Sequence, residues 1–278
     1  MRSLRRAAAP IAAVSAALLL VAGCGDDDKD DKGKKDDKST GQTPGGSGAP
    51  SAPADKPAST ITVLAAASLT SAFEEAGKAY TKNHKDQNVK FSFAGSQELA
   101  AQVKQGAPAD VIATADTKTM DGLAAQVNAP QVFAKNKLTI LVAPGNPKKI
   151  TSLADLSRGD LTVVLAGPTV PVGRYAREAL GKAGVAVKPK SEEVDVKAVV
   201  TRVRMGEADA GIVYTTDAKS AGEAVASVEI PDQHNVVASY PVAVIKESKQ
   251  QDPAAAFTQW LRTPEAQEIL KKYGFAAP

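Results

Sequence analysis

Two serines occupy positions that suit the binding of a small anion. Ser68 lies within ITVLAAASLTSAFEEA (61–76), and Ser96 lies within FSFAGSQELAAQVKQGAPAD (91–110). In both stretches an apolar strand pattern ends in alanine or glycine, and a helical pattern begins at the serine. The first N–H groups of a helix have no partner within the helix and carry partial positive charge. Each serine therefore offers a hydroxyl and a backbone N–H to an oxyanion, and the repetition favours this interpretation over two ordinary capped helices.

Three further positions can supply donors to the same anion. In GPTVPVGRYA (167–176), two prolines stiffen the approach to a helix start, where Val172 presents a backbone N–H group. Asp195 is an expected helix N-cap, which makes Val196 the first residue of that helix. Tyr214 ends an apolar strand, from which its hydroxyl is expected to reach a cleft. A half-buried core tyrosine with its hydroxyl in water is the alternative.

The five positions share one chemical property, because none of them carries a charge. Their hydroxyl and N–H groups donate hydrogen bonds, and several such bonds in a dry cleft can hold a dianion without a counter-charge. A protonated oxyanion would bring an O–H group that finds no acceptor there. We therefore expect phosphate, which is protonated near neutral pH, to bind poorly, whereas sulfate must be excluded by the size of the cavity.

Alternating strand and helix patterns place these positions at strand ends and helix starts. Thr60–Leu64 and Val89–Phe93 are predicted strands, and if they are parallel neighbours, both serines lie at the carboxyl edge of one sheet, where open α/β folds bind ligands. Further strands are predicted at 110–114, 137–144, 161–167, 211–214 and 236–245. Further helices are predicted at 117–124, from Ser152, and at 172–183, 196–204, 253–261 and 264–273. The alternation predicts a mostly parallel α/β architecture, and residues 60–278 are enough for two lobes.

The N-terminal residues have the pattern of an export signal. Three arginines, at positions 2, 5 and 6, precede an uncharged apolar run at 11–21 that is too short to span a bilayer comfortably. We therefore predict a signal peptide at 1–23. LVAGC, which ends at Cys24, resembles the lipobox of bacterial lipoproteins, and this resemblance implies a diacylglyceryl group on the Cys24 sulfur. Two acyl chains on one residue anchor a protein stably to a membrane; a buried structural cysteine is the alternative.

The composition changes sharply in residues 24–59. DDDKDDKGKKDDK is a mixed charge run, and the part that follows is rich in Gly, Ser, Pro and Ala. Neither part holds enough apolar residues for a core, so we predict a disordered linker. Calcium binding by the aspartates is the alternative, but the interspersed lysines cancel their charge and the combined glycine and glutamate pattern of an EF-hand loop does not appear.

The charges of the chain are nearly balanced. There are 34 basic and 31 acidic side chains, and the predicted signal peptide contains three of the arginines. The small net positive charge therefore belongs largely to the targeting segment. This balance indicates no basic face for nucleic acid.

Several motifs, in this order, resemble the molybdate-binding proteins of bacterial ABC importers. They are ITVLAAASLT, FAGS before a helix, GAPAD, VPVGRYAREAL, GIVYTTDA and KKYGF, and together they extend over residues 60–278. The resemblance implies a two-lobed type II periplasmic-binding-protein fold, an α/β fold with a ligand cleft between the lobes. The expected first lobe comprises residues 60–140 and 238–278, the second lobe residues 141–237, and the hinge the crossovers near Leu138–Ala143 and Val237–Val242.

The resemblance also implies which groups contact the anion. In this family the first lobe contributes hydroxyl and N–H groups of two serines, which match Ser68 and Ser96. The second lobe contributes backbone N–H groups at positions that match Val172 and Val196, and a tyrosine hydroxyl that matches Tyr214. These groups bind the oxygens of molybdate by hydrogen bonds, with no direct coordination of the metal. Val172 replaces an alanine common in relatives, which makes the wall bulkier but leaves the main-chain contact available.

The expected protein is an extracytoplasmic, lipid-anchored, monomeric receptor that binds molybdate, and tungstate too, and delivers it to an ABC permease and its ATPase. It needs no cofactor and is not an enzyme. The alternatives are a receptor for another oxyanion or a small organic anion, and a secreted serine hydrolase. AASLT and AGSQE fit neither G-x-S-x-G nor S-x-x-K, and His84 and His234 are expected in exposed loops, which argues against the hydrolase. No cluster of His, Cys or carboxylates in the sequence indicates a metal site.

Overall fold

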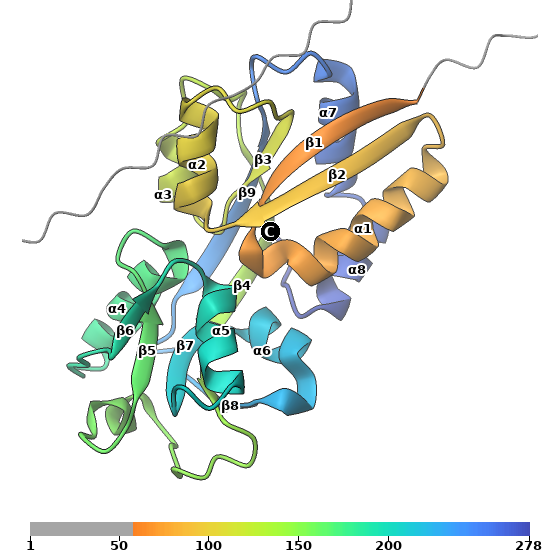
Figure 1. Ribbon diagram of the computed structural model, residues 1–278. Helices are drawn as coiled ribbons and strands as arrows, with labels where there is room; N and C mark the ends of the chain where they lie inside the picture. The colour runs from red at the N-terminus through yellow and green to blue at the C-terminus, as the bar shows by residue number, and fades with distance from the viewer. Residues whose placement is uncertain (1–57) are drawn as a thin grey trace, which may run out of the picture. The chain divides into compact units, whose positions relative to one another are not determined.

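A computed structural model describes residues 58–278, which form one mixed sheet with helices packed against it (Figure 1). The strands are β1 (Ser59–Ala66), β2 (Gln87–Ala94), β3 (Val111–Ala113), β4 (Gln131–Val142), β5 (Val163–Ala166), β6 (Ser191–Glu193), β7 (Ala210–Tyr214), β8 (Ala226–Glu229) and β9 (Val237–Val244). The helices are α1 (Thr70–Asn83), α2 (Ser96–Lys104), α3 (Thr117–Asp121), α4 (Pro171–Lys182), α5 (Val196–Arg204), α6 (Thr215–Ala221), α7 (Gln251–Trp260) and α8 (Pro264–Lys272), with 3-10 segments η1 (Ala67–Leu69), η2 (Leu153–Ser157) and η3 (Gly222–Ala224).

The N-terminal predictions fall largely outside this range. The predicted signal peptide (1–23), Cys24 and the predicted linker up to residue 57 lie outside the described residues. Ser59, which the sequence pattern assigns to the end of the linker, is the first residue of β1.

Strand β4 connects two parts of the sheet. The strand order is β2-β1-β3-β9-β4-β7-β5-β6, and β8 also pairs with β4. Residues 131–137 of β4 pair with β9, whereas residues 138–142 pair with β7 and β8. We call β1, β2, β3 and β9 with their helices the first lobe, and β5, β6, β7 and β8 with their helices the second lobe. Figure 1 shows β4 and β9 running between the two.

The sheet is mixed, whereas the sequence pattern predicts a mostly parallel one. β1 pairs in parallel with β2 and β3, and β5 pairs in parallel with β6 and β7. β4 is antiparallel to β7, β8 and β9, and β9 is antiparallel to β3. Every antiparallel pair involves β4 or β9, because these strands carry the chain from one lobe to the other and back.

Both faces of the first-lobe sheet are buried, which explains why the second half of β1, Val63–Ala66, is apolar at every position instead of alternating. Ile61 and Val63 belong to one core together with Phe73 of α1 and Phe257 of α7. Leu64 belongs to the opposite core, which contains apolar side chains of α2 and α3 (Leu99, Val103 and Met120). The two layers fix the carboxyl ends of β1 and β2, and with them η1 and the start of α2.

Amphipathic packing positions the two helix starts of the second lobe. Buried apolar side chains recur every three or four residues in both helices: Val172, Ala176, Ala179 and Leu180 in α4, and Val196, Val199, Val200 and Val203 in α5. Pro171 occupies the first turn of α4, where a backbone N–H is not needed for the helix. The prediction of a helix at 196–204 is confirmed at both ends.

Short elements are where the sequence patterns and the structure differ. The helix predicted from Ser152 is instead the 3-10 segment η2. Ser152 and Asp155 form a capping box at its N-terminus. The strand predicted at 137–144 begins earlier, at Gln131. The sequence patterns predict neither β6 and β8, which have three and four residues, nor α6. Within residues 58–278 no helix combines the length and the apolar character needed to cross a membrane.

Candidate functional site

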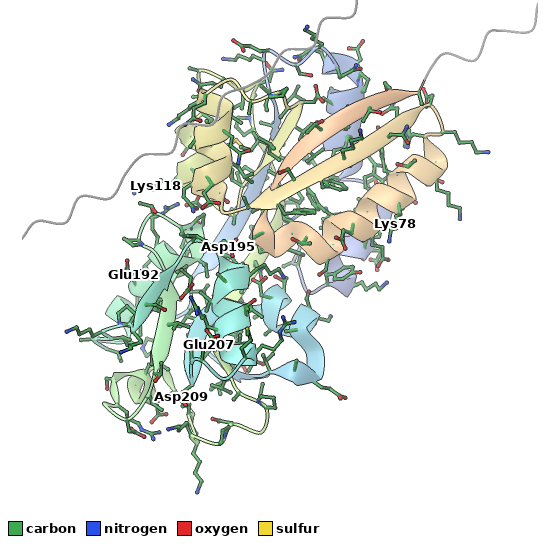
Figure 2. The ribbon with its side chains drawn as sticks, viewed as in Figure 1. Lys78, Lys118, Glu192, Asp195, Glu207 and Asp209 are labelled. Atoms are coloured by element: carbon green, nitrogen blue, oxygen red, sulfur yellow. The ribbon has the colours of Figure 1, made fainter. Side chains whose placement is uncertain are left out.

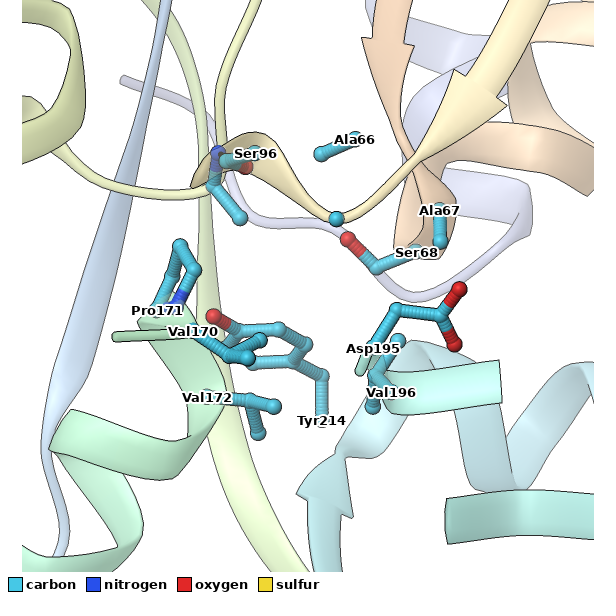
Figure 3. A pocket seen from close by; sticks show the side chains of 12 residues that line it. Ala66, Ala67, Ser68, Ser96, Val170, Pro171, Val172, Asp195, Val196 and Tyr214 are labelled. Atoms are coloured by element: carbon cyan, nitrogen blue, oxygen red, sulfur yellow. Dashed lines mark hydrogen bonds between the residues drawn. The ribbon is translucent and has the colours of Figure 1, made fainter. Parts of the chain in front are cut away.

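A small cavity lies between the lobes, and all five residues predicted to bind an anion line it (Figure 3). Ser68 and Ser96 come from the first lobe, and Val172, Val196 and Tyr214 come from the second. The other lining residues are mostly small or apolar: Ala66, Ala67, Gly95, Ala115, Val170, Pro171 and Asp195. The cavity is small: the volume that the centre of a water molecule can occupy in it is about 10 Å³.

Ser68 does not open helix α1, contrary to the prediction. It lies in the middle of η1, and α1 begins two residues later at Thr70, with Leu69 as its N-cap. The Ser68 hydroxyl lies 2.9 Å from the hydroxyl of Tyr240 and caps no N–H group of α1. The tight 3-10 turn after β1 accounts for the shift, because it carries Ser68 past the strand end before α-helical geometry begins. Ser68 therefore reaches the cavity from a turn.

Ser96 is the first residue of α2, as predicted, and it follows a strand that is the parallel neighbour of β1. The Ser96 oxygen accepts a hydrogen bond from the N–H of Ala115 at 3.0 Å. Because that backbone group can only donate, the Ser96 hydroxyl keeps its own proton for another acceptor. A Cβ at Gly95 would lie 2.8 Å from the carbonyl oxygen of Val194, so glycine suits the point where α2 meets the second lobe.

The start of α4 lies directly against the end of β5. A Cβ at Gly173 would overlap the carbonyl oxygens of Ala166 and Gly167, so only glycine fits there. This close contact places the first turn of α4, including the N–H of Val172, at the wall of the cavity. Arg177, one turn further along, donates to the Ala166 carbonyl at 2.8 Å and holds the same junction.

An acidic residue lines the cavity at the start of α5. Asp195 is the N-cap of that helix, as predicted, and its carboxylate accepts the Ala198 N–H at 2.8 Å. Asp195 lies at the end of α5 that faces the first lobe (Figure 2), and its carboxylate points away from the Tyr214 hydroxyl (Figure 3). The cap uses one donor of the first turn and leaves the N–H of Val196 for another acceptor. Its charge repels an anion, so hydrogen bonds must supply the attraction.

The Tyr214 hydroxyl is buried and has no hydrogen-bond partner among residues 58–278. The residue is 1% exposed, so the alternative of a half-buried tyrosine with its hydroxyl in water is wrong. Burial raises the pKa of Tyr214, so the phenol keeps its proton at neutral pH. An unpaired buried donor is unfavourable unless a ligand accepts its proton. The geometry at the end of β7 therefore suits a hydrogen-bond donor to a bound acceptor.

The basic side chains beside the cavity are paired with carboxylates. Within residues 58–278, no lysine or arginine lines the cavity. Arg174 of α4 pairs with the carboxylate of Asp116, which is 2% exposed and belongs to the first lobe, and it donates to the Thr119 hydroxyl at 3.1 Å. Lys197 of α5 lies 3.0 Å from the carboxylate of Asp217, and burial raises the pKa of Asp217. An anion in this cavity meets hydrogen-bond donors, and the cations beside it have carboxylate partners.

Further contacts between distant parts of the chain surround the cavity, and sequence reasoning missed them. Gln97 of α2 donates from Nε2 to the carbonyl oxygen of Val194 at 2.8 Å. Asn136 of β4 donates from Nδ2 to the Thr216 hydroxyl at 2.8 Å. The partners are 97 and 80 residues apart in the chain, so no local pattern could indicate either contact.

The residues needed for hydrolysis or metal binding do not gather in the described part of the chain. His84 stacks on Tyr80, with 4.1 Å between the ring centres, and neither His84 nor His234 lines the cavity. Residues 58–278 contain no group of three or more His, Cys, Asp or Glu side chains arranged to hold a metal ion.

Comparison with known proteins places this geometry in context. Residues 61–276 match the family model of the bacterial extracellular solute-binding proteins. Molybdate-binding protein ModA of Mycobacterium tuberculosis is 43% identical over 224 residues, which cover 80% of this chain and 86% of that protein. The putative ABC transporter substrate-binding lipoprotein YvgL of Bacillus subtilis is 30% identical over 227 residues, which cover 78% and 86%. The structure of the periplasmic molybdate-binding protein of Azotobacter vinelandii aligns with a TM-score of 0.69 at 22% identity and covers 78% of this chain and 99% of that one. The predicted two-lobed type II periplasmic-binding-protein fold is confirmed.

Proposed function

We propose a ligand and a role for this chain from the premise that it belongs to the bacterial extracellular solute-binding proteins, the family that includes molybdate-binding protein ModA. The chain is therefore an extracytoplasmic solute-binding protein, and the solute that we propose is molybdate. One observation carries this proposal. A single cavity brings the hydroxyls of Ser68, Ser96 and Tyr214 together with the first turns of α4 and α5, which begin near Val172 and Val196.

A tetrahedral dianion suits this set of donors. Each of its oxygens accepts hydrogen bonds, and a hydrogen bond to a charged group contributes about 1.5–3 kcal/mol. Several such bonds outweigh the repulsion from Asp195, whose carboxylate is already engaged with the Ala198 N–H. The narrow space supports a compact inorganic ion over an organic anion with several carbon atoms. Tungstate, which has the same charge and shape as molybdate, is the second ligand that we propose.

Ligand release is proposed to follow from a movement of the lobes. We propose residues 60–140 and 238–278 as the first lobe and residues 141–237 as the second. β4 changes its pairing partner between Lys137 and Leu138, which supports a hinge near Leu138–Ala143 and Val237–Val242. Opening at this hinge separates the serines from the donors of the second lobe and exposes the ion to water.

The remaining parts of the proposal concern transport. The chain delivers its ion to an ABC permease and its ATPase, acts as a monomer, catalyses no reaction and needs no cofactor. Lipidation of Cys24 anchors it to the outer face of the cell membrane. The motif LVAGC supports this anchor, and so does the lipoprotein designation in the name of the similar Bacillus subtilis protein.

Titration calorimetry on the full chain, purified free of ligand, tests the proposed function. We expect tight one-to-one binding of molybdate and tungstate, with sulfate and phosphate weak or absent. Combining Ser68→Ala with Ser96→Ala removes two donors, and we expect molybdate affinity to fall by about a hundredfold or more. Ser157→Ala combined with Ser227→Ala is the matched control, because both serines lie outside the cavity. Unchanged affinity in the first double variant would contradict the proposed site.

A further inference from the structure

Behind Ser68, a chain of buried hydrogen bonds leads away from the cavity. The hydroxyls of Ser68 and Tyr240 are 2.9 Å apart, and the Tyr240 hydroxyl lies 3.4 Å from Nδ2 of Asn136. Asn136 and Tyr240 are 3% and 0% exposed. The direction of the proton between Ser68 and Tyr240 decides whether Ser68 presents a donor or an acceptor to the cavity. That direction follows from the groups at the far end of the chain.

The amide of Asn136 can take only one orientation. Its Oδ1 accepts the backbone N–H of Lys137 at 3.0 Å and the hydroxyl of Thr215 at 2.9 Å. Rotating the amide by half a turn would bring its NH₂ group against the N–H of Lys137, two donors with no acceptor between them. Nδ2 therefore faces Thr216 and Tyr240, and it can only donate.

The orientation of Asn136 fixes the proton of Tyr240. The phenol oxygen accepts from Nδ2 of Asn136, so its own O–H has the Ser68 oxygen as acceptor. If Tyr240 accepted from Ser68 as well, its proton would have to face the neighbouring Tyr214 hydroxyl, which makes no hydrogen bond within residues 58–278, and it would be buried without an acceptor. The ring is enclosed by Tyr214 and Phe275, with ring centres 5.7 and 5.3 Å away. Burial also raises the pKa of Tyr240, so this proton is retained at neutral pH.

We propose that Tyr240, oriented by Asn136, is a positioning residue that makes the Ser68 hydroxyl a hydrogen-bond donor toward the bound oxyanion. This inference rests on the proposed function and explains how the cavity would reject a protonated ion. Ser96 reaches the same state through one bond, because the N–H of Ala115 occupies its oxygen. Within residues 58–278, no backbone N–H donates to the Ser68 oxygen. A serine hydroxyl that is free to rotate can accept a hydrogen bond as readily as it donates one. Tyr240 removes that freedom.

Sulfate and phosphate provide the discriminating probes, because they are similar in size and differ in the proton that phosphate carries near neutral pH. We expect Tyr240→Phe in the full chain to lower the affinity for molybdate by about three- to tenfold. In the same variant, we expect the affinity for phosphate relative to that for sulfate to rise by at least about threefold, because Ser68 can then rotate and accept a hydrogen bond from the phosphate O–H. Tyr80→Phe is the matched control, since Tyr80 is a buried tyrosine of α1 whose hydroxyl bonds Gln87 at 2.6 Å and lies outside the cavity.

A second comparison separates positioning from a general loss of structure. In a chain that carries Ser68→Ala, adding Tyr240→Phe should leave the sulfate-to-phosphate ratio unchanged, because no hydroxyl remains to be oriented. Thermal unfolding without ligand reports whether either variant is destabilised. The positioning role is wrong if Tyr240→Phe lowers the affinities for all three anions by the same factor. It is also wrong if Tyr240→Phe changes the sulfate-to-phosphate affinity ratio equally in chains with and without Ser68→Ala.

The outcomes also separate this inference from the proposed function. A parent chain that binds molybdate tightly, with a Tyr240→Phe variant that behaves like Tyr80→Phe, would overturn the positioning role alone. A parent chain that binds sulfate or phosphate but not molybdate would overturn the proposed ligand, and the sulfate-to-phosphate ratio would still decide the role of Tyr240. A parent chain that binds none of the three anions would overturn both.

Discussion

The hydroxyl of Tyr214 is expected to favour ligand binding and to destabilise the ligand-free protein. It is buried without a partner in the described chain, at the wall of the proposed anion site. We expect Tyr214→Phe to weaken molybdate binding by about tenfold or more, because one donor to a charged ligand is lost. Without ligand, the same variant should unfold at an equal or higher temperature, because an unpaired polar group has been removed from the interior.

Calorimetry and thermal unfolding of the same samples check this prediction. Tyr273→Phe is the control, since the Tyr273 hydroxyl bonds Glu75 at 2.8 Å and neither residue lines the cavity. Loss of stability together with unchanged molybdate affinity would show that Tyr214 is a structural residue.

The positions of the five candidate residues can be predicted from sequence because each lies at the end of a strand or the start of a helix, which the neighbouring residues indicate. A strand end followed by small residues and a helical pattern is visible without knowledge of the rest of the chain. The groups that orient them are not visible in this way. Ser68 and Tyr240 are 172 residues apart, and their contact depends on how β9 is placed in the sheet. The roles of the five residues in binding stay predictions.

At the scale of elements, the junction between β5 and α4 controls where the N–H of Val172 points. We expect Gly173→Ala to weaken molybdate binding by about tenfold or more, because the new methyl group would overlap the Ala166 and Gly167 carbonyls and displace the first turn. Gly181 lies later in the same helix, and a Cβ there would meet nothing within 4 Å. Gly181→Ala should therefore leave affinity unchanged and stabilise the helix by up to about 1 kcal/mol.

Calorimetry on the two glycine variants makes this comparison within one helix. Equal affinities in Gly173→Ala and Gly181→Ala would show that the first turn of α4 tolerates displacement, and that the Val172 N–H contributes little.

Longer elements follow from sequence more faithfully than short ones. The apolar spacing of α5 is enough to place both of its ends, because one face of the helix is buried along its whole length. The start of α1 is misplaced by two residues, because Ser68 is a favourable N-cap type whose hydroxyl bonds Tyr240 instead of the helix. β6 and β8 are too short to show a period, and they are strands only because β5 and β4 lie beside them.

At the scale of the whole folded unit, the Arg174–Asp116 ion pair is expected to favour the closed arrangement of the lobes. The pair joins α4 to the residue that caps α3, and opening would expose both groups to water. We expect Arg174→Met to speed molybdate release by about tenfold. In the closed arrangement the carboxylate of Asp116 would be nearly buried without its cation, whereas in the open arrangement water would solvate it, so the variant destabilises the closed arrangement alone. Asp116→Asn should have a similar effect, while its side chain still caps α3.

Release of isotope-labelled molybdate into excess unlabelled ion measures this rate. Arg158→Met is the control, because Arg158 pairs with Asp160 at 2.8 Å and both residues belong to the second lobe. Unchanged release from Arg174→Met and Asp116→Asn would show that the pair does not hold the lobes together.

The place of β9 in the sheet determines the order in which the lobes can be completed during synthesis. β9 is the last strand in the sequence, yet it lies between β3 and β4. During synthesis from the N-terminus, β1, β2 and β3 are made early, but β3 lacks its second neighbour, β9, until residues 237–244 have been made. The strands of the second lobe are contiguous in the chain and can assemble before that point. The lobe that is begun first is thus finished last, through contacts of long sequence separation that form slowly. For an extracytoplasmic protein, we expect this delay to leave the first lobe incomplete until its last strand has been made.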